Sequence, residues 1–346
     1  MQVPMSSPSP SPPRLPIGPN QPWLAPLAGF SDLPFRLLCR EMGCAAACTE
    51  MISAKGLLYH SSGTWDLLRT CSQDHPLVVQ LFGAEAEVIA EAVSGLKEMG
   101  FSFFDLNAGC PVKKVVKTGA GAALLHHPPH LCKVLSAMVD VAGPGRVGVK
   151  LRSGVTSGTE VLSWIQGLDS LGLGWVSLHP RTVRQGYAGR ADWQVLDAVS
   201  RKMQLPVLAS GDLISARDGL HCMQSTQAGG LMFARGALAD PGIFAAYLKA
   251  LKDGEEHSRE EKDALVRTLR TARRHIELTR EHGRGDHELL RMRTIIPRYM
   301  RGFPGVKHVR QRVVACRTWS ELVSYLDQVE MQSAQDLQRP SNIPHT

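Results

Sequence analysis

The sequence predicts an α/β protein, a (β/α)8 TIM barrel followed by a small C-terminal helical-bundle domain. Eight short apolar runs alternate with amphipathic segments of helical period from Trp23 to about residue 241. Beyond Pro241 the alternation stops, and residues 255–328 show helical periodicity without a plausible strand. With 346 residues, of which 43% are hydrophobic, the chain is long enough for a barrel and a second unit.

The ends of the chain differ in composition from the rest. Residues 1–21 are rich in Pro and Ser and lack the apolar segment of a signal peptide. We therefore expect a disordered tail (1–21), a barrel domain (22–245), a helical domain (246–331) and a flexible C-terminal tail (332–346). The eight cysteines form no C-x-x-C pair, and no apolar run is long enough to span a membrane. We expect a cytoplasmic monomer without membrane association.

The predicted strands are short runs of apolar and β-branched residues that end in polar or glycine-bearing loops. They comprise residues 23–27, 45–49, 77–81, 104–106, 147–150, 175–178, 207–209 and 230–233.

The predicted helices carry start and stop signals. Ser31 and Asp32 cap a helix over 35–41 that Gly43 ends, and Gly100 ends the next one. The remaining barrel helices are expected at 84–99, 128–139, 159–171, 191–203 and 216–225, and the bundle helices at 258–281, 286–301, 306–316 and 320–330.

The stretch from Phe103 to Lys114 combines a buried strand with a cysteine at its end. Ala108-Gly109-Cys110-Pro111 breaks the strand, because proline cannot continue the pairing. Lys113 and Lys114 follow and create a positive field suited to a polyanion. A buried structural cysteine is the ordinary alternative for such a residue.

Chemistry in such barrels gathers at the carboxyl ends of the strands. A single lysine at a strand end is more often an ion-pair partner, and a single histidine is more often a core residue. Several polar residues placed together at the strand ends indicate a binding or catalytic site instead. The candidate cofactor-binding residues at these positions are Pro26, Leu27, Ala28, Gln80, Asn107, Lys150, His179, Ser210, Gly211, Asp212, Ala234 and Arg235. Loops after strands seven and eight suit a phosphate, Gln80 and Lys150 suit a heterocycle, and Cys110 faces it. This combination suits flavin mononucleotide (FMN).

Other cofactors and metals fit the sequence less well. Neither G-x-G-x-x-G nor G-x-x-x-x-G-K-[ST] stands between a strand and a helix, which argues against Rossmann and P-loop sites. His126, His127 and His130 are interrupted by two prolines and lack a thiol or carboxylate at ligand spacing. We expect no metal.

The positive charge is concentrated in the C-terminal part. The chain has a formal net charge of +7, and residues 249–317 contain 18 Lys and Arg against 10 Asp and Glu. A solvated helix surface is the ordinary interpretation of such charges. Their concentration in one region favours a nucleic acid as partner.

Several motifs together resemble the tRNA-dihydrouridine synthases, most closely the bacterial B-type branch. They are Leu24-Ala-Pro-Leu-Ala-Gly-Phe-Ser-Asp-Leu-Pro-Phe-Arg36, Asn107-Ala-Gly-Cys-Pro111, Lys150-Leu-Arg152, His179-Pro-Arg-Thr182, Ser210-Gly-Asp212 and Met300-Arg-Gly-Phe-Pro-Gly305. The resemblance extends from about Trp23 to Glu330. The family usually has Asn at the position of Ser210 and Gly at the position of Ala234, so slightly altered phosphate contacts are expected. At 234 the backbone N–H can serve if its φ is negative.

The resemblance implies an FMN enzyme that uses NADPH to saturate the C5–C6 bond of particular uridines in tRNA. Hydride would pass from N5 of reduced FMN to C6, and Cys110, which matches the general acid, would protonate C5. The candidate tRNA contacts are Lys113, Lys114, Arg152, Arg181, Arg184, Arg291, Arg293, Arg298 and Arg301. Two alternatives stay open: an FMN barrel that acts on free pyrimidines, and a non-catalytic RNA-binding protein on a decayed barrel.

Overall fold

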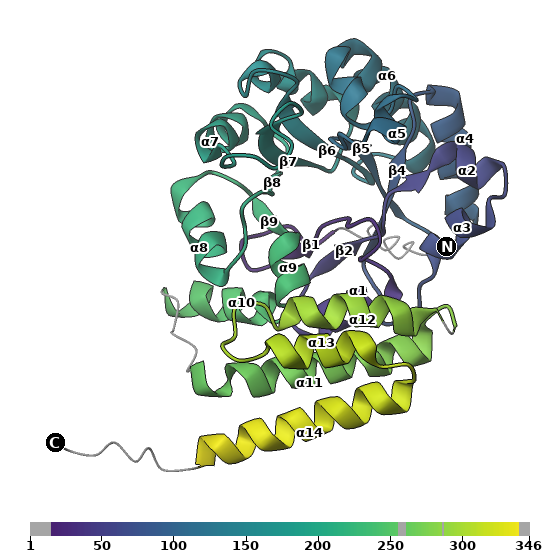
Figure 1. Cartoon of the computed structure of the whole chain (residues 1–346). Coiled ribbons are helices and arrows are strands. Elements are labelled where there is room, and N and C mark those ends of the chain that lie inside the picture. The colour runs from purple at the N-terminus through teal and green to yellow at the C-terminus, as the bar shows by residue number, and fades with distance from the viewer. Residues whose placement is uncertain (1–14, 255–260, 286, 339–346) are drawn as a thin grey trace, which may run out of the picture.

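The computed structural model describes residues 15–254, 261–285 and 287–338. Parallel strands form a closed barrel surrounded by helices, and a layer of C-terminal helices packs against one side of it (Figure 1). The strand order is β2-β1-β9-β8-β7-β6-β5-β4-β3, and the pairing of β2 with β4 closes the barrel. The predicted (β/α)8 barrel with C-terminal helices is confirmed.

The eight predicted strands are all present, and a further short strand, β3, pairs with the end of β4. The strands are β1 (Trp23–Leu24), β2 (Ala46–Cys48), β3 (Ile52–Ser53), β4 (Leu77–Phe82), β5 (Phe103–Ala108), β6 (Val147–Gly154), β7 (Trp175–Thr182), β8 (Val207–Ala209) and β9 (Gly230–Phe233). Strands β5, β6 and β7 run further toward their carboxyl ends than predicted. Several candidate site residues therefore lie within regular strands.

The helices around the barrel include those predicted at 35–41, 84–99, 128–139, 191–203 and 216–225, together with several short helices that the sequence analysis did not predict. They are α1 (Leu33–Glu41), α2 (Ala54–Leu58), α3 (Ser62–Trp65), η1 (Asp66–Leu68), α4 (Ala86–Glu98), α5 (Lys113–Val116), η2 (Gly121–His126), α6 (Pro128–Ala142), η3 (Glu160–Ser163), η4 (Ile165–Leu171), α7 (Trp193–Lys202), α8 (Ala216–Ser225) and α9 (Arg235–Ala239). Asp32 caps α1 as predicted, because its side chain accepts a hydrogen bond from the Phe35 amide.

The predicted α-helix over 159–171 is instead two 3-10 helices. They meet at Trp164, whose φ of −135° does not belong to a helix. The sequence pattern located the segment but not its type, because a non-helical backbone angle at Trp164 interrupts it.

The C-terminal helices are α10 (Ile243–Asp253), α11 (Glu261–His282), α12 (Glu288–Tyr299), α13 (Lys307–Ala315) and α14 (Trp319–Gln338). Helix α10, which the sequence analysis did not predict, packs on α8 of the barrel. The predicted bundle helix at 320–330 continues to Gln338, so it enters the segment expected to be a flexible tail. Residues 339–346 and the predicted helix start at residue 258 lie outside the described residues.

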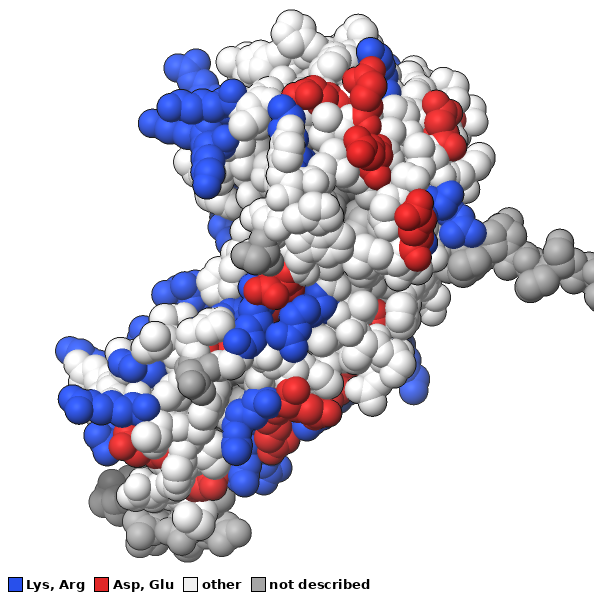
Figure 2. Space-filling view, turned by 90° about the vertical axis from the view of Figure 1, so that its right-hand side faces the viewer, with Lys and Arg blue, Asp and Glu red and all other residues white. Residues whose placement is uncertain are grey.

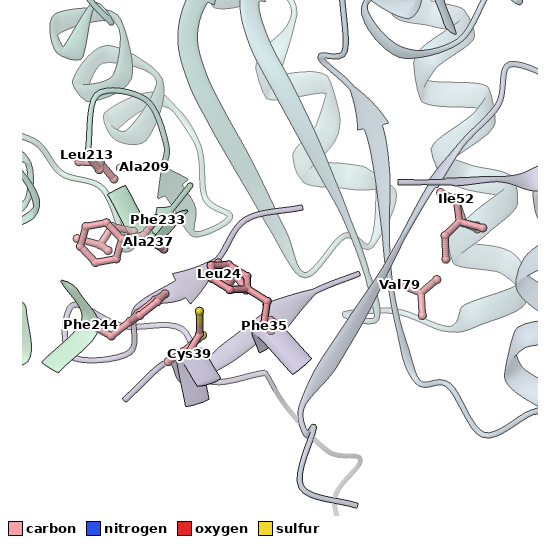
Figure 3. Packing of buried hydrophobic residues seen from close by; sticks show 14 of the residues in the cluster. Leu24, Phe35, Cys39, Ile52, Val79, Ala209, Leu213, Phe233, Ala237 and Phe244 are labelled. Atoms are coloured by element: carbon pink, nitrogen blue, oxygen red, sulfur yellow. The ribbon is translucent and has the colours of Figure 1, made fainter. Parts of the chain in front are cut away.

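The barrel interior is filled in layers, because side chains of one strand point alternately inward and outward. The lowest layer is apolar: Trp23 and Trp175 meet edge to face with ring centroids 5.6 Å apart, and Phe103, Leu208 and Met232 surround them. Outward-pointing side chains pack against the helices instead. Figure 3 shows part of this outer core. The tryptophan layer closes the amino end of the barrel beneath the inward-pointing polar residues.

Part of the predicted N-terminal tail belongs to the fold, which corrects the expectation for residues 15–21. Leu15 and Ile17 pack against the tryptophan layer, and the Trp23 indole N–H donates to the Pro16 carbonyl at 2.7 Å. The Tyr247 hydroxyl donates to the carbonyl of Pro19. This segment covers the amino end of the barrel, which its Pro-rich composition did not predict. Residues 1–14 lie outside the described part of the chain.

A buried cluster of charges joins the helical domain to the first barrel loop. Arg291 of α12 forms ion pairs with Asp32 and Glu288, whose side chains are only 5% and 3% exposed. Its other terminal nitrogen donates to the carbonyls of Gly29 and Phe30. Arg291 was predicted to contact tRNA, but its guanidinium is instead engaged between the two domains.

We predict that Arg291→Ala lowers the free energy of unfolding by about 3 kcal/mol, because it leaves two buried carboxylates without their cation. Denaturant titration at equilibrium measures this change. Arg301→Ala serves as control, since the Arg301 side chain is exposed and makes no hydrogen bond or ion pair with any described residue. Equal stability of the two variants would contradict the role given to Arg291.

Candidate active site

The candidate residues at the strand ends surround two adjoining pockets at the carboxyl end of the barrel. The larger has a volume of about 440 Å³ and is lined by Gln80, Asn107, Cys110 and the Pro26–Ala28 segment, among others. The smaller, of about 90 Å³, lies over the loops after β8 and β9. Lys150, His179 and Arg235 line both. All thirteen residues predicted to bind cofactor or act in catalysis lie on these pockets.

The Cys110 loop is held by its backbone on both sides. The amide of Cys110 donates to Oδ1 of Asn107 at 2.9 Å, and its carbonyl accepts from the amide of Ala122 at 3.0 Å. Gly121 is required at this contact, because its φ is +61° and a Cβ there would lie 2.8 Å from the Cys110 carbonyl oxygen. The half-buried Cys110 residue thus lines the pocket from a defined position.

A chain of side-chain hydrogen bonds runs beneath the pocket. Asn107 Nδ2 donates to Gln80 Oε1 at 2.9 Å, and Gln80 Nε2 donates to Asp105 Oδ2 at 2.7 Å. Asn107 also accepts from the amides of Gly109 and Cys110. The Asn107 Nδ2 group also donates to Sδ of Met51 at 3.7 Å. Asn107, predicted to bind cofactor, therefore has its oxygen engaged with the cysteine loop and its NH₂ group with Gln80 and Met51.

Lys150 is a half-buried cation beside this chain. Its ammonium makes no hydrogen bond or ion pair with any residue in the described part of the chain. Burial lowers the pKa of Lys150, whereas the charge of Asp105 opposes that shift. Burial raises the pKa of Asp105 in turn, and Lys150 is among the groups that lower it. An ammonium without a protein partner is available to an electron-rich ligand.

His179 is a neutral imidazole. Burial lowers its pKa to about 2, and Lys150, Arg152, Arg181 and Arg235 add to the shift. Its Nε2 lies 3.1 Å from Nη1 of Arg181, which can only donate, so Nε2 is the acceptor. Nδ1 then carries the proton.

The loops after β8 and β9 form the second end of the site. Gly211 has a φ of +107°, and a Cβ there would lie 2.5 Å from the His179 ring. Burial raises the pKa of the Asp212 carboxyl group, but hydrogen bonds from the Ala191 amide and from Arg181, with the charge of Arg235, lower it overall. At Ala234 φ is −124°. This negative value is the backbone angle at which the sequence analysis expects the Ala234 N–H to be able to contact a phosphate.

Two of the predicted tRNA contacts are structural instead. Arg152 is 3% exposed and donates to the carbonyls of Gly109, Thr182 and Gly186. Arg181 is 2% exposed and bonds Asp212 as well as two carbonyls of its own loop. Their guanidinium groups hold the loops that form the pocket wall, so phosphates of a large ligand cannot reach them easily. Sequence position did not distinguish this role from surface binding.

The other predicted contacts differ in exposure. Lys113, Lys114, Arg184 and Arg301 are exposed, whereas Arg293 and Arg298 are half-buried. Arg298 lies over the Phe30 ring, 4.9 Å from its centroid. Figure 2 shows lysines and arginines along one edge of both the barrel and the helical domain, with a hollow between them.

Two site residues were not predicted from the sequence. Tyr187 lines both pockets, and the guanidinium groups of Arg152 and Arg235 each lie over its ring, 5.6 and 5.0 Å from the centroid. It is the aromatic residue of an otherwise polar, glycine-bearing loop, and that contrast could have indicated it. Asp105 is a carboxylate within an apolar strand, which is also an unusual pattern.

No three His, Cys, Asp or Glu side chains among the described residues are grouped so that they could hold a metal ion. In the same residues, no helix has the length and apolar character needed to cross a membrane.

Comparisons with known proteins agree on one family. The family model described as "Dihydrouridine synthase (Dus)" matches residues 23–337. The chain is 32% identical over 309 residues to "Probable tRNA-dihydrouridine synthase 1" of Synechocystis, covering 88% of this chain and 84% of that protein. It is 32% identical to "tRNA-dihydrouridine synthase B" of Pseudomonas aeruginosa over 238 residues, covering 68% of this chain and 71% of that protein.

A solved structure of 6-hydroxypseudooxynicotine amine oxidase from Pseudomonas geniculata superimposes with a TM-score of 0.51. It is 14% identical and covers 73% of this chain and 50% of that one. This likeness concerns the fold alone.

We predict that His179 stays neutral from pH 8 to pH 5, because four neighbouring cations and burial disfavour a further charge. Nitrogen NMR shifts of its ring, assigned with His179→Gln, should show no inflexion in that range. The unfolded chain takes up this proton near pH 6.5, so His179 lowers the free energy of unfolding as the pH falls below about 6.5. An inflexion near pH 6.5 in the folded protein would refute this.

Proposed function

Because the chain belongs to the dihydrouridine synthase family, whose model covers residues 23–337, we propose that it reduces the C5–C6 double bond of specific uridines in tRNA. In this proposal FMN is the cofactor, NADPH is the reductant and Cys110 is the general acid. The observation that carries the proposal is the position of Cys110, which lines the same pocket as Lys150 and His179.

The pocket residues fit FMN. The Lys150 ammonium is available to the electron-rich edge of a ring, and Gln80 lines the pocket beside it while its amide pairs with Asn107 and Asp105. Pro26, Leu27 and Ala28 offer a flat apolar wall. At the other end, the loops that contain Ser210–Asp212 and Ala234–Arg235 suit the phosphate. When bound and reduced, FMN supplies the hydride for C6 of the uracil ring.

The protein's part in the chemistry is the proton. The Cys110 S–H bond breaks, the proton passes to C5, and the thiolate that remains is reprotonated from solvent. A positioned acid of this kind contributes about 10² to 10⁴ in rate. Lys150 and the neighbouring arginines stabilise negative charge on the ring in a largely desolvated site.

A uridine in folded tRNA must leave its stack to enter the pocket, at a cost of a few kcal/mol. Phosphate contacts on the basic edge offset this cost. We propose that Lys113, Lys114 and Arg184 of the barrel contribute them together with Arg301 and the half-buried Arg293 and Arg298. The expected setting remains a monomer in the cytoplasm.

We predict that Cys110→Ala binds FMN and oxidises NADPH like the wild type but forms dihydrouridine roughly 10²-fold more slowly or worse, since it loses the acid alone. Flavin absorbance, NADPH consumption and mass spectrometry of tRNA measure the three properties. Cys132→Ala is the control, because Cys132 is also partly exposed but lies on α6, away from the pockets. Full dihydrouridine formation by Cys110→Ala would refute the assignment.

We predict that replacing Lys113 and Lys114 together by Glu weakens tRNA binding at least roughly tenfold at 0.1 M salt and makes it less salt-dependent, because phosphate contacts are lost. Filter binding across a salt series measures this. Lys202→Glu is the control for reversal of charge as such. Lys202 lies in the last turn of α7, at the end of the barrel opposite the pockets. Unchanged affinity, or reduction of free uracil as fast as of tRNA, would contradict the proposed interface.

A further inference from the structure

Asp105 is a buried carboxylate below the pocket that none of the steps above uses. It points into the barrel from β5, one layer above the tryptophans, since it shares its strand face with Phe103 and Asn107. It is 1% exposed. One of its oxygens, Oδ1, makes no full hydrogen bond with any described residue, although the nearby indole N–H of Trp175 helps to lower the pKa of the carboxyl group. Such a group costs stability, so its presence calls for a role other than packing.

The contacts of Asp105 give the hydrogen-bond chain a single direction. An ionised carboxylate accepts only, so the NH₂ group of Gln80 must face it. The Gln80 oxygen then faces Asn107 and accepts from its NH₂ group. The Asn107 oxygen is left for the two backbone amides at the other end. Those amides can only donate, so both ends of the chain demand the same orientation.

The hydrogen-bond chain from Asp105 to the Cys110 amide also crosses from one barrel strand to the next. Gln80 lies opposite Asp105 in the pairing of β4 with β5, and Asn107 lies opposite Lys150 in the pairing of β5 with β6. The chain therefore starts below the pocket and ends at the backbone amides of Gly109 and Cys110. Each side chain between those ends is held from two directions.

We propose that Asp105 is a positioning residue for the reaction, which holds Gln80, and through it Asn107 and the Cys110 loop, in one hydrogen-bonded arrangement. This inference rests on the proposed function for its catalytic consequence, but the arrangement itself can be measured without substrate. Asp105 acts through hydrogen bonding to Gln80 and touches no reacting atom. Its charge also favours the protonated state of Lys150, which is a separate effect.

Two substitutions separate hydrogen bonding from charge. Asp105→Asn keeps an oxygen that can accept from Gln80 but removes the charge, whereas Asp105→Leu keeps the approximate size and removes both. Ser177→Ala is the matched control. Ser177 is buried on β7, faces the barrel interior opposite Lys150, and its hydroxyl has no hydrogen-bond partner among the described residues.

The first readout is hydrogen–deuterium exchange of the Gly109 and Cys110 amides in flavin-free protein. We expect Asp105→Leu to speed this exchange at least roughly tenfold, and Asp105→Asn and Ser177→Ala to stay within about threefold of the wild type. Thermal unfolding should show a loss of stability in Asp105→Leu, since it leaves the buried NH₂ group of Gln80 without its acceptor. Thermal unfolding therefore checks only that the variant is folded under the conditions of the exchange measurement.

The second readout is turnover of tRNA at saturating substrate with FMN bound. Asp105→Leu should lose at least tenfold in kcat with a KM close to that of the wild type, while Asp105→Asn recovers most of the rate. If wild-type protein forms no dihydrouridine, the proposed function fails, but the exchange experiment still decides the arrangement.

Two results would overturn the inference: unchanged amide exchange in Asp105→Leu, or equal impairment in Asp105→Asn and Asp105→Leu, which would assign the effect to charge. If Asp105→Leu does not fold, Gln80→Met is the alternative, because it removes the amide that joins Asp105 to Asn107. It is expected to speed the same amide exchange. Wild-type exchange in Gln80→Met would then count against the proposal.

Discussion

The structure depends on the alternation of side chains along the barrel strands, which sorts every second residue into the barrel interior. At the amino end that interior is closed by Trp23 and Trp175 with smaller apolar neighbours. The next inward position on β5 carries the buried Asp105, and Lys150, Asn107 and other polar residues above it line the pocket. Because the apolar layer keeps water from below, the polar layer lies in a medium where charges and hydrogen bonds act strongly.

That environment explains the electrostatics of the site. The pocket is surrounded by more cations than carboxylates, with Asp105 below and Asp212 at one end. His179 is consequently neutral, and Lys150 has no hydrogen-bond or ion-pair partner among the residues that the structure describes. Such a site favours an electron-rich ring and an anionic group at opposite ends, which is the arrangement that FMN in the proposed function requires.

The helical domain has two relations to the barrel. Its basic residues enlarge the positive edge in Figure 2. Arg291, which pairs with buried carboxylates, fixes the loop that contains Gly29 and Phe30, and Phe30 lines the larger pocket. Arg298 packs on the same aromatic ring. The domain that is proposed to bind tRNA therefore also supports the wall of the pocket, so its removal would alter the barrel site directly.

The sequence by itself determined the barrel, its eight strands, the position of Cys110 and the set of residues around it. These follow from local patterns: the apolar period identifies each strand, and closure of parallel strands brings their carboxyl ends together. Only the tertiary structure decided what each charged side chain contacts. In the sequence, Arg152, Arg181 and Arg291 cannot be told apart from the exposed Arg301, since all four were predicted to contact tRNA. The first three differ because their partners come from distant segments of the chain. The docking of residues 15–21 and the chain from Asp105 to Cys110 were likewise decided by packing, because burial and hydrogen bonding between elements leave no periodic trace in a single sequence.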